Sequence, residues 1–144
     1  MTTTRSPAAP LAGKIVLDTN NYYWERDGRF SELDRGEATT SGLLQQHLTG
    51  AKVVKAFNTL NWTKMVDPAS SGGPVSIPIV GDDAAARATV AELVKGMGLE
   101  PVDLGPLRFA NTLEEMLVIW ANARSHNAAY NYYLRPEPAA APAR

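Results

Sequence analysis

Four short apolar runs, each ending in a polar cluster, divide the chain and predict the strands of an α/β fold. They are near-continuously apolar and rich in β-branched residues, as in strands that are covered on both faces of a sheet. The runs occupy residues 14–18, 53–57, 75–80 and 100–104. Pro78 removes a backbone donor from the third run, which predicts that this strand lies at a sheet edge or carries a bulge.

Apolar residues at helical spacing predict three helices between and after these runs. The first covers residues 41–48, the second ends at about residue 97, and the third begins with the capping-box spacing of a threonine followed three residues later by Glu115. The expected N-caps are Thr40 or Ser41, Asp82 or Asp83, and Thr112. Between the first strand and the first helix, the polar and aromatic loop 19–39 has no core pattern, so we expect it to be functional or poorly ordered.

The order of these elements predicts a partial Rossmann-like, doubly wound fold. Strands that alternate with helices form a mostly parallel sheet with helices on its faces, followed here by a C-terminal helix. We expect this layer at residues 13–108 and a C-terminal helical segment at 109–135. Residues 1–12 and 136–144 are rich in Ala, Pro, Thr and Arg, which predicts disordered tails because such segments bury little apolar surface.

Charge disfavours two kinds of partner, and cysteine content excludes two kinds of site. The 144 residues include 14 Lys and Arg against 15 Asp and Glu, without a block of like charges, so neither nucleic acid nor an anionic membrane is an expected partner. Cysteine is absent, which excludes disulfides and thiolate metal sites and is compatible with the cytoplasm. No segment approaches the ~20 apolar residues of a membrane span or the run of a secretory signal.

Polar side chains follow the first two predicted strands at the point where each strand ends. Ligands of open α/β sheets bind beside such strand ends, and short amides and hydroxyls can hydrogen-bond a carboxamide or a ring edge. The competing interpretation is a set of local turns and helix caps, which the same residue types favour. The two clusters consist of Thr19, Asn20 and Asn21 after the first strand, and Phe57, Asn58 and Thr59 after the second.

Three phrases in order, KVVKAFNT at 52–59, IPIVGDDAAARATVAELVKGMGLE at 77–100 and PVDLGPL at 101–107, resemble the NADP oxidoreductases that use the deazaflavin coenzyme F-420. The cytosolic reductase domain of the six-transmembrane metalloreductases carries a similar run. The resemblance covers residues 13–107. It implies hydride transfer between a nicotinamide cofactor, NADP or NAD, and a deazaflavin or flavin. It also makes the six strand-end residues the candidate cofactor contacts, with no catalytic acid, base or metal among them.

The resemblance further implies that an N-terminal nucleotide-binding half is lacking. That family's G-x-G-x-x-G turn is expected before Gly13, where this chain has only twelve residues and no such turn. The strand at 14–18 would then lack its usual neighbour, and an unpaired apolar edge favours pairing with another chain. We therefore expect a homodimer, a separately encoded N-terminal half, or a truncated product that is inactive alone.

Two other classes of protein remain open at this stage. One is a non-catalytic, oligomerising remnant of the same fold. The other is a PIN-like, magnesium-dependent ribonuclease, because VLDTN at 16–20 resembles the first strand of that family. Its candidate magnesium ligands are Asp18, Glu37, Asp82 and Asp103. The aromatic residues of the C-terminal helix, including Trp120, are expected to belong to a core or a subunit interface.

Overall fold

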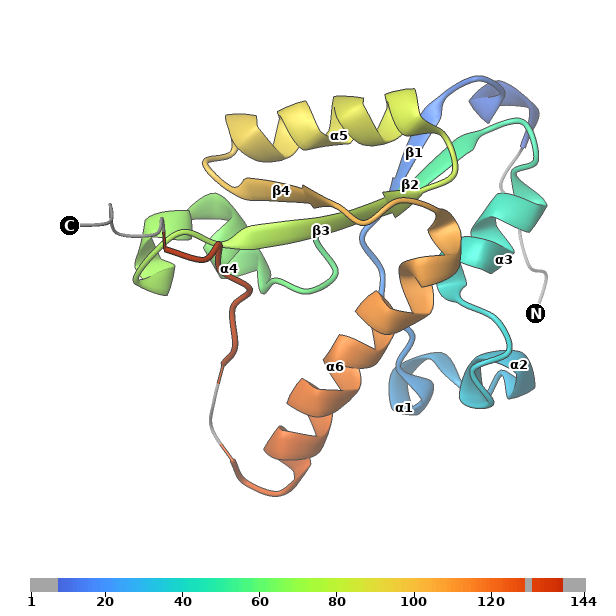
Figure 1. Ribbon diagram of the computed structural model, residues 1–144. Coiled ribbons are helices and arrows are strands. Elements are labelled where there is room, and N and C mark those ends of the chain that lie inside the picture. The colour runs from blue at the N-terminus through green and yellow to red at the C-terminus, as the bar shows by residue number, and fades with distance from the viewer. Residues whose placement is uncertain (1–7, 129–130, 139–144) are drawn as a thin grey trace.

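The computed structural model of the chain describes residues 8–128 and 131–138, in which one four-stranded sheet is covered by helices on both faces (Figure 1). The strands are β1 (Ile15–Asp18), β2 (Lys52–Lys55), β3 (Ser76–Gly81) and β4 (Glu100–Asp103). The helices are α1 (Trp24–Asp27), α2 (Ser31–Asp34), α3 (Thr40–His47), α4 (Trp62–Val66), α5 (Ala84–Gly96) and α6 (Ala110–Ser125). Three 3-10 turns complete the described chain, at Ala9–Leu11, Pro68–Ser71 and Leu107–Phe109.

The predicted fold class is confirmed, with one strand reversed. The sheet has the order β1-β2-β3-β4, and its β1–β2 and β3–β4 pairs are parallel whereas β2–β3 is antiparallel. The connection from β2 to β3 contains only α4 and a 3-10 turn. A five-residue helix spans about 7.5 Å, so α4 by itself does not carry the chain back along the sheet for a parallel return.

Pro78 lies in an interior strand, so the predicted edge position for the whole strand is wrong. In β3, however, β4 pairs with Ser76–Ile79 while β2 reaches only Val80 and Gly81. The N–H of Ser76 points away from β4 and donates to the carbonyl of Leu134 at 2.7 Å. Because backbone groups alternate along a strand, the nitrogen of Pro78 points to the same side, where β2 does not extend. The proline is therefore tolerated at a local edge.

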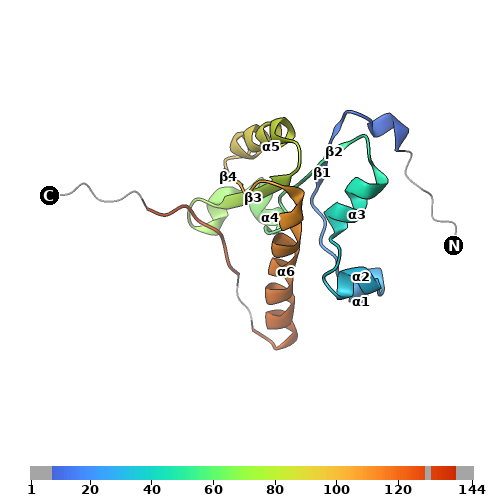
Figure 2. The same ribbon diagram turned by 45° about the vertical axis from the view of Figure 1, so that its right-hand side comes forward.

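Two hydrophobic clusters lie on the two faces of the sheet. One joins β3 to the buried stripe of α5, formed by Ala86, Val90 and Val94. The other joins Val53 and Val80 to the start of α6. Figure 2 shows α6 leaving the sheet and standing between the C-terminal segment on one side and α1 and α2 on the other. In this position, α6 forms part of the candidate site.

The helix predictions were accurate for α5 and less so elsewhere. Asp83 caps α5 by accepting the N–H of Ala86 at 2.8 Å. The cap of α3 is Thr39, one residue before those predicted, because its hydroxyl reaches the N–H of Gly42. The capping box at Thr112 was wrong: α6 begins at Ala110 without a side-chain cap, since the preceding 3-10 turn leads directly into it.

Three short helices were not predicted, namely α1 and α2 in the loop 19–39 and α4 after β2. The predicted tails fall mostly outside the described residues, and within the N-terminal one Ala9–Leu11 form a turn. In the described part of the chain, no helix combines the length and apolar character needed to cross a membrane.

Candidate functional site

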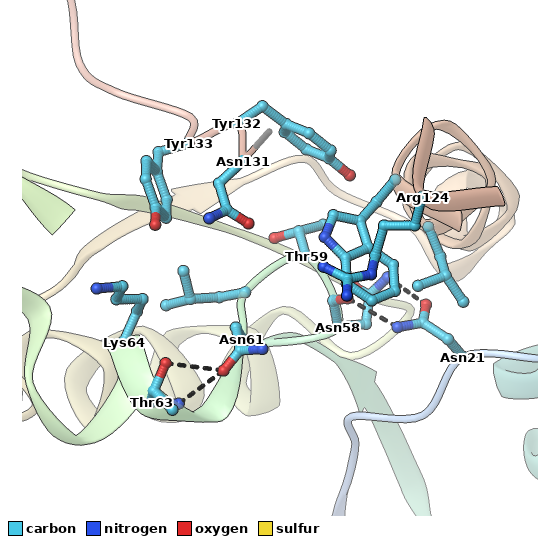
Figure 3. A pocket seen from close by; sticks show the side chains of 13 residues that line it. Asn21, Asn58, Thr59, Asn61, Thr63, Lys64, Arg124, Asn131, Tyr132 and Tyr133 are labelled. Atoms are coloured by element: carbon cyan, nitrogen blue, oxygen red, sulfur yellow. Dashed lines mark hydrogen bonds between the residues drawn. The ribbon is translucent and has the colours of Figure 1, made fainter. Parts of the chain in front are cut away.

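The two predicted polar clusters meet beside the ends of β1 and β2. Parallel pairing places Asp18 opposite Lys55, so the residues that follow each strand emerge at the same edge of the sheet. The side-chain amide of Asn21 donates to the carbonyl of Asn58 at 2.8 Å, and the amide of Asn58 donates back to Asn21 Oδ1 at 3.0 Å (Figure 3). The two strand ends are thereby cross-linked by a reciprocal pair of hydrogen bonds.

Phe57 contributes to this arrangement through its backbone. Its side chain is 4% exposed and belongs to the core cluster on the α5 face. Its φ angle is +67°, a left-handed conformation that is uncommon outside glycine and that persists where the surrounding structure enforces it. The turned backbone directs the next residue, Asn58, toward β1 and α6.

Asn58 carries a buried acceptor that is unsatisfied among the described residues. Its Nδ2 group donates to Asn21 and, at 2.8 Å, to the carbonyl of Leu113 in α6, whereas its Oδ1 has no partner in the described part of the chain. The residue is 7% exposed. A buried acceptor without a partner costs on the order of 1–3 kcal/mol, which a donor from a ligand would recover.

Two cavities flank the stripe of α6 formed by Leu117, Trp120 and Arg124. The strap-side cavity, of about 350 Å³, lies between this stripe, Asn58, Thr59 and the C-terminal strap, which we define as residues 131–135 (Figure 3). The loop-side cavity, of about 640 Å³, lies on the other side of the stripe. It is lined by Thr19, Asn20, Asn21, Tyr23, Glu25 and Arg26. Both volumes are in the range of cofactor and small-molecule pockets.

The strap-side cavity is electropositive and partly aromatic. Lys64 and Arg124 line it, and no carboxylate is among its lining residues. The ammonium of Lys64 donates to the neutral hydroxyl and carbonyl of Ser70, and the guanidinium of Arg124 lies 5.0 Å from the ring centroid of Trp120. The rings of Tyr132 and Trp120 form part of its wall. Such a wall suits a planar ring that carries an anionic group.

A buried ionic cluster lies directly beneath the strand ends. Lys55 is fully buried, and its Nζ lies 3.1 Å from Asp18 Oδ2 and 2.9 Å from Glu114 Oε1. It also donates to the carbonyl of Asn20 at 2.9 Å, and to two hydroxyls of the α3 N-terminus. The cluster therefore ties β1, β2, α3 and α6 to one ammonium group and holds the backbone of the first polar cluster in place.

Asp18 is the more deeply buried of the two carboxylates in this cluster. Burial is the largest single influence and would raise its pKa, but the charge of Lys55 and the hydrogen bonds from Ser41, the Asn20 N–H and Lys55 together outweigh it. The pKa of Asp18 therefore lies below its ordinary value. The carboxylate is ionised at neutral pH and, as a result, remains paired with the ammonium of Lys55.

Five of the six predicted contacts line one or both cavities, and sequence reasoning missed the groups that α6 and the strap add. Trp120 was expected in a core or an interface, yet it forms the partition between the two cavities. Lys55 was also overlooked, although a lysine inside an otherwise apolar strand was a visible signal for a buried charge. Its partner Glu114 lies 59 residues further along the chain and had no such signal.

The carboxylates nominated for a ribonuclease do not come together. They have separate partners: Asp18 beside Lys55, Glu37 beside Arg35, Asp82 at the N–H of Leu107, and Asp103 beside Arg87. Among the described residues there is no group of three or more His, Cys, Asp or Glu that could hold a metal ion. The geometry thus offers no support for two-metal or one-metal phosphodiester hydrolysis.

Comparison with known proteins agrees with the resemblance carried by the three phrases. No protein-family model matches the chain. The crystal structure of a candidate F420-dependent NADP reductase from Arthrobacter sp. FB24 superposes with a TM-score of 0.75 and 32% identity, over 91% of this chain and 60% of that one. A hypothetical protein from Sinorhizobium meliloti superposes with a TM-score of 0.56 and 35% identity, over 67% and 46%.

Metalloreductase STEAP3 of Rattus norvegicus is 33% identical over 112 residues, which are 76% of this chain and 21% of the relative. The chain thus spans about a fifth of the length of that curated relative and 60% of the length of the Arthrobacter protein. Over most of its own length, this chain is therefore similar in sequence and fold to a candidate F420-dependent NADP reductase and similar in sequence to a metalloreductase, and its fold is oxidoreductase-like.

Proposed function

We propose that this chain supplies one wall of a nicotinamide cleft in an NAD(P)-dependent oxidoreductase, in which hydride passes between the nicotinamide and a deazaflavin such as coenzyme F-420, or a flavin. The observation that carries the proposal is the Asn21–Asn58 amide pair, which joins two strand ends beside open cavities. The likeness to one candidate reductase named for NADP and F420 supports the choice of cofactors.

In this proposal the candidate cofactor contacts are Thr19, Asn20, Asn21, Asn58 and Thr59, with Phe57 acting through its turned backbone. The unpartnered Oδ1 of Asn58 fits a cofactor with an amide, because a carboxamide N–H would satisfy it. When bound, the nicotinamide and its partner ring supply the hydride chemistry. The chain's own residues would orient the ring through amide hydrogen bonds and exclude water with Leu117 and Trp120.

The outer edge of β1 is exposed, and the proposal places a partner there. No other strand pairs with β1 on its outer side within the described residues, and Ile15 on that strand is 37% exposed. A dinucleotide-binding half with a glycine-rich turn would complete the cleft from this side if a separate polypeptide supplied it, whereas a second copy of this chain would cover the edge without adding such a turn. NAD and NADP would be distinguished by residues of that half.

The experiment is a titration of NADPH and NADP⁺ that follows the fluorescence of Trp120 in the full chain with Trp24→Phe and Trp62→Phe. We expect saturable quenching, and Asn58→Leu should weaken binding about tenfold because it removes the carboxamide partner and the link to β1. Asn111→Leu is the matched control, since Asn111 is exposed and lines neither cavity.

Two outcomes separate the proposal from its rivals. A defined oligomer that binds neither nicotinamide nor flavin cofactors would favour a non-catalytic, oligomerising remnant of the fold. Equal affinities of the Asn58→Leu and Asn111→Leu variants would show that cofactor binds elsewhere. Adding an N-terminal half that contains a glycine-rich turn should restore or strengthen binding if the cleft is shared between two polypeptides.

A further inference from the structure

The C-terminal strap is attached to the sheet at the one place where β3 has an open side. The N–H of Ser76 donates to the carbonyl of Leu134, so the strap runs beside the half of β3 that β2 does not reach. Figure 1 shows this segment returning from the far end of α6 to the level of the sheet. The strap therefore lines the same cavity as α6 and α4.

Arg135 fastens the end of the strap. Its guanidinium donates through Nη1 to the carbonyl of Pro74 at 2.8 Å and through Nη2 to the carbonyl of Ser71 at 2.7 Å. The group lies against Gly73, where an added Cβ would come within 2.6 Å of Nη1. Hydrogen bonds from an ionised donor are stronger than neutral ones, and here the planar fork reaches two carbonyls at once.

A second attachment holds the other end of the strap against α6. The hydroxyl of Tyr132 donates to the carbonyl of Met116 at 2.5 Å, and Tyr133 packs on the core cluster of the α5 face. Asn131 and the two tyrosines line the strap-side cavity (Figure 3), and Trp120 of α6 lines it as well. Three strap residues thus contribute to the lining of the cavity.

We propose that Arg135 is a positioning residue that keeps the strap docked, and that the docked strap encloses a planar, anionic ring in the strap-side cavity. Lys64 and Arg124 provide the positive charge for the acidic group, and Trp120 provides a face for the ring. The docking statement stands without the nicotinamide proposal. The second part of the proposal, the ligand statement, rests on the nicotinamide proposal and adds the class of molecule that binds on this side of α6.

The first test measures strap docking without any ligand. In the full chain with Trp24→Phe and Trp62→Phe, iodide quenching of Trp120 reports access to the cavity. Arg135→Ala should raise the quenching constant at least about twofold, because loss of the two carbonyl contacts allows local opening. Gly73→Ala should act in the same direction while keeping the arginine, since its new methyl group displaces the guanidinium.

Matched controls separate docking from general destabilisation. Arg108→Ala removes an arginine that stacks on Phe109, away from the strap, and Gly96→Ala adds a methyl group where nothing lies within 4 Å. Both should quench like the parent. Arg135→Lys should fall between parent and alanine variant, because a lysine can reach one carbonyl but does not present a fork. Far-ultraviolet circular dichroism should remain unchanged in the strap variants.

The second test measures ligand enclosure with flavin mononucleotide and with riboflavin, which lacks the phosphate. We expect the phosphate-bearing probe to bind more tightly, and Arg135→Ala and Gly73→Ala each to weaken it about tenfold. Quenching constants equal to the parent in both variants would overturn the docking statement. Increased quenching with unchanged probe affinity, or no difference between the two probes, would overturn the ligand statement. Failure of NADPH to bind would bear only on the nicotinamide proposal.

Discussion

Substitution of Lys55 by methionine should destabilise the protein more than loss of any exposed ion pair in the chain. Methionine has a similar length and is apolar, so the change removes the charge and leaves the packing volume nearly intact. Asp18, with a side chain 1% exposed, and Glu114, with a side chain 12% exposed, would then face each other across the cluster without a cation. The carbonyl of Asn20 would also lose its donor.

The size of the loss follows from the burial of these groups. Removing one partner of a buried, hydrogen-bonded ion pair costs about 3–5 kcal/mol, because the remaining charge is left uncompensated. The slight exposure of Glu114 moves part of its charge toward water, so the carboxylate of Asp18 dominates the cost. Against a domain stability of about 5–15 kcal/mol, the Lys55→Met variant should be marginal at neutral pH.

The stability of the parent and that of the Lys55→Met variant should depend on pH in opposite directions. In the parent, the pKa of Asp18 lies below its ordinary value of 3.8, so its ionisation stabilises the fold above that pH and the contribution is lost as the pH falls through the folded pKa. In Lys55→Met, burial and the nearby Glu114 should raise the pKa of Asp18 above that value. Stability of the variant is then lost as the pH rises through the raised pKa.

Urea unfolding, followed by fluorescence and circular dichroism, measures both quantities. The difference in unfolding free energy between parent and Lys55→Met should grow from about pH 4.5 to about pH 7, by at most about 1.4 kcal/mol per pH unit for each proton. Adding Asp18→Asn and Glu114→Gln should recover most of the loss, because the uncompensated charges disappear. Lys95→Met, which breaks the exposed pair with Glu92, should cost less than about 1 kcal/mol. A Lys55→Met loss as small as that of Lys95→Met, or one that does not change with pH, would refute the reasoning.

Two further predictions concern the sheet and helix α5. Gly81→Ala should lower the free energy of unfolding in urea by about 1–3 kcal/mol, because the new Cβ would lie 2.9 Å from the carbonyl oxygen of Val53. Gly96→Ala should leave the free energy of unfolding unchanged or raise it by up to about 1 kcal/mol, because nothing lies within 4 Å of the new Cβ. Equal effects of these two variants would contradict the packing of β3 against β2. Asp83→Ala should lower the unfolding free energy by about 1 kcal/mol, because α5 loses its cap, whereas Asp83→Asn should lower it by only a few tenths of a kcal/mol. A similar loss in both variants would mean that the charge of Asp83, and not its hydrogen bond with the N–H of Ala86, stabilises this end of the helix.

Local pattern was sufficient for the elements whose stability is decided by neighbours in sequence. The four strands and α5 lie where apolar runs and helical spacing placed them, and Asp83 caps its helix because the acceptor and the N–H of Ala86 are three residues apart. The cap predicted at Thr112 was wrong because a 3-10 turn already supplies the first turn of α6. The reversal of β3 depends on how a connection of about twenty residues crosses the sheet edge, which periodicity does not encode.

One part of the candidate site was predictable from the sequence, and the other part was not. Residue types at strand ends predicted that Asn21 and Asn58 would approach each other, because parallel neighbours bring their carboxyl ends to one edge. The identity of the opposite wall was not predictable, since Trp120 and the strap reach the cavity only after α6 has left the sheet at its particular angle.

The amino-acid sequence by itself determined the α/β class, the positions of the strands and the polar clusters at their ends, because each rests on propensities and spacings within a few residues. Only the tertiary structure decided that Lys55 is buried between Asp18 and Glu114, and that Arg135 fastens a strap across a cavity. Those contacts join residues 37 to 64 positions apart, and their free energy depends on burial and geometry that no local pattern contains.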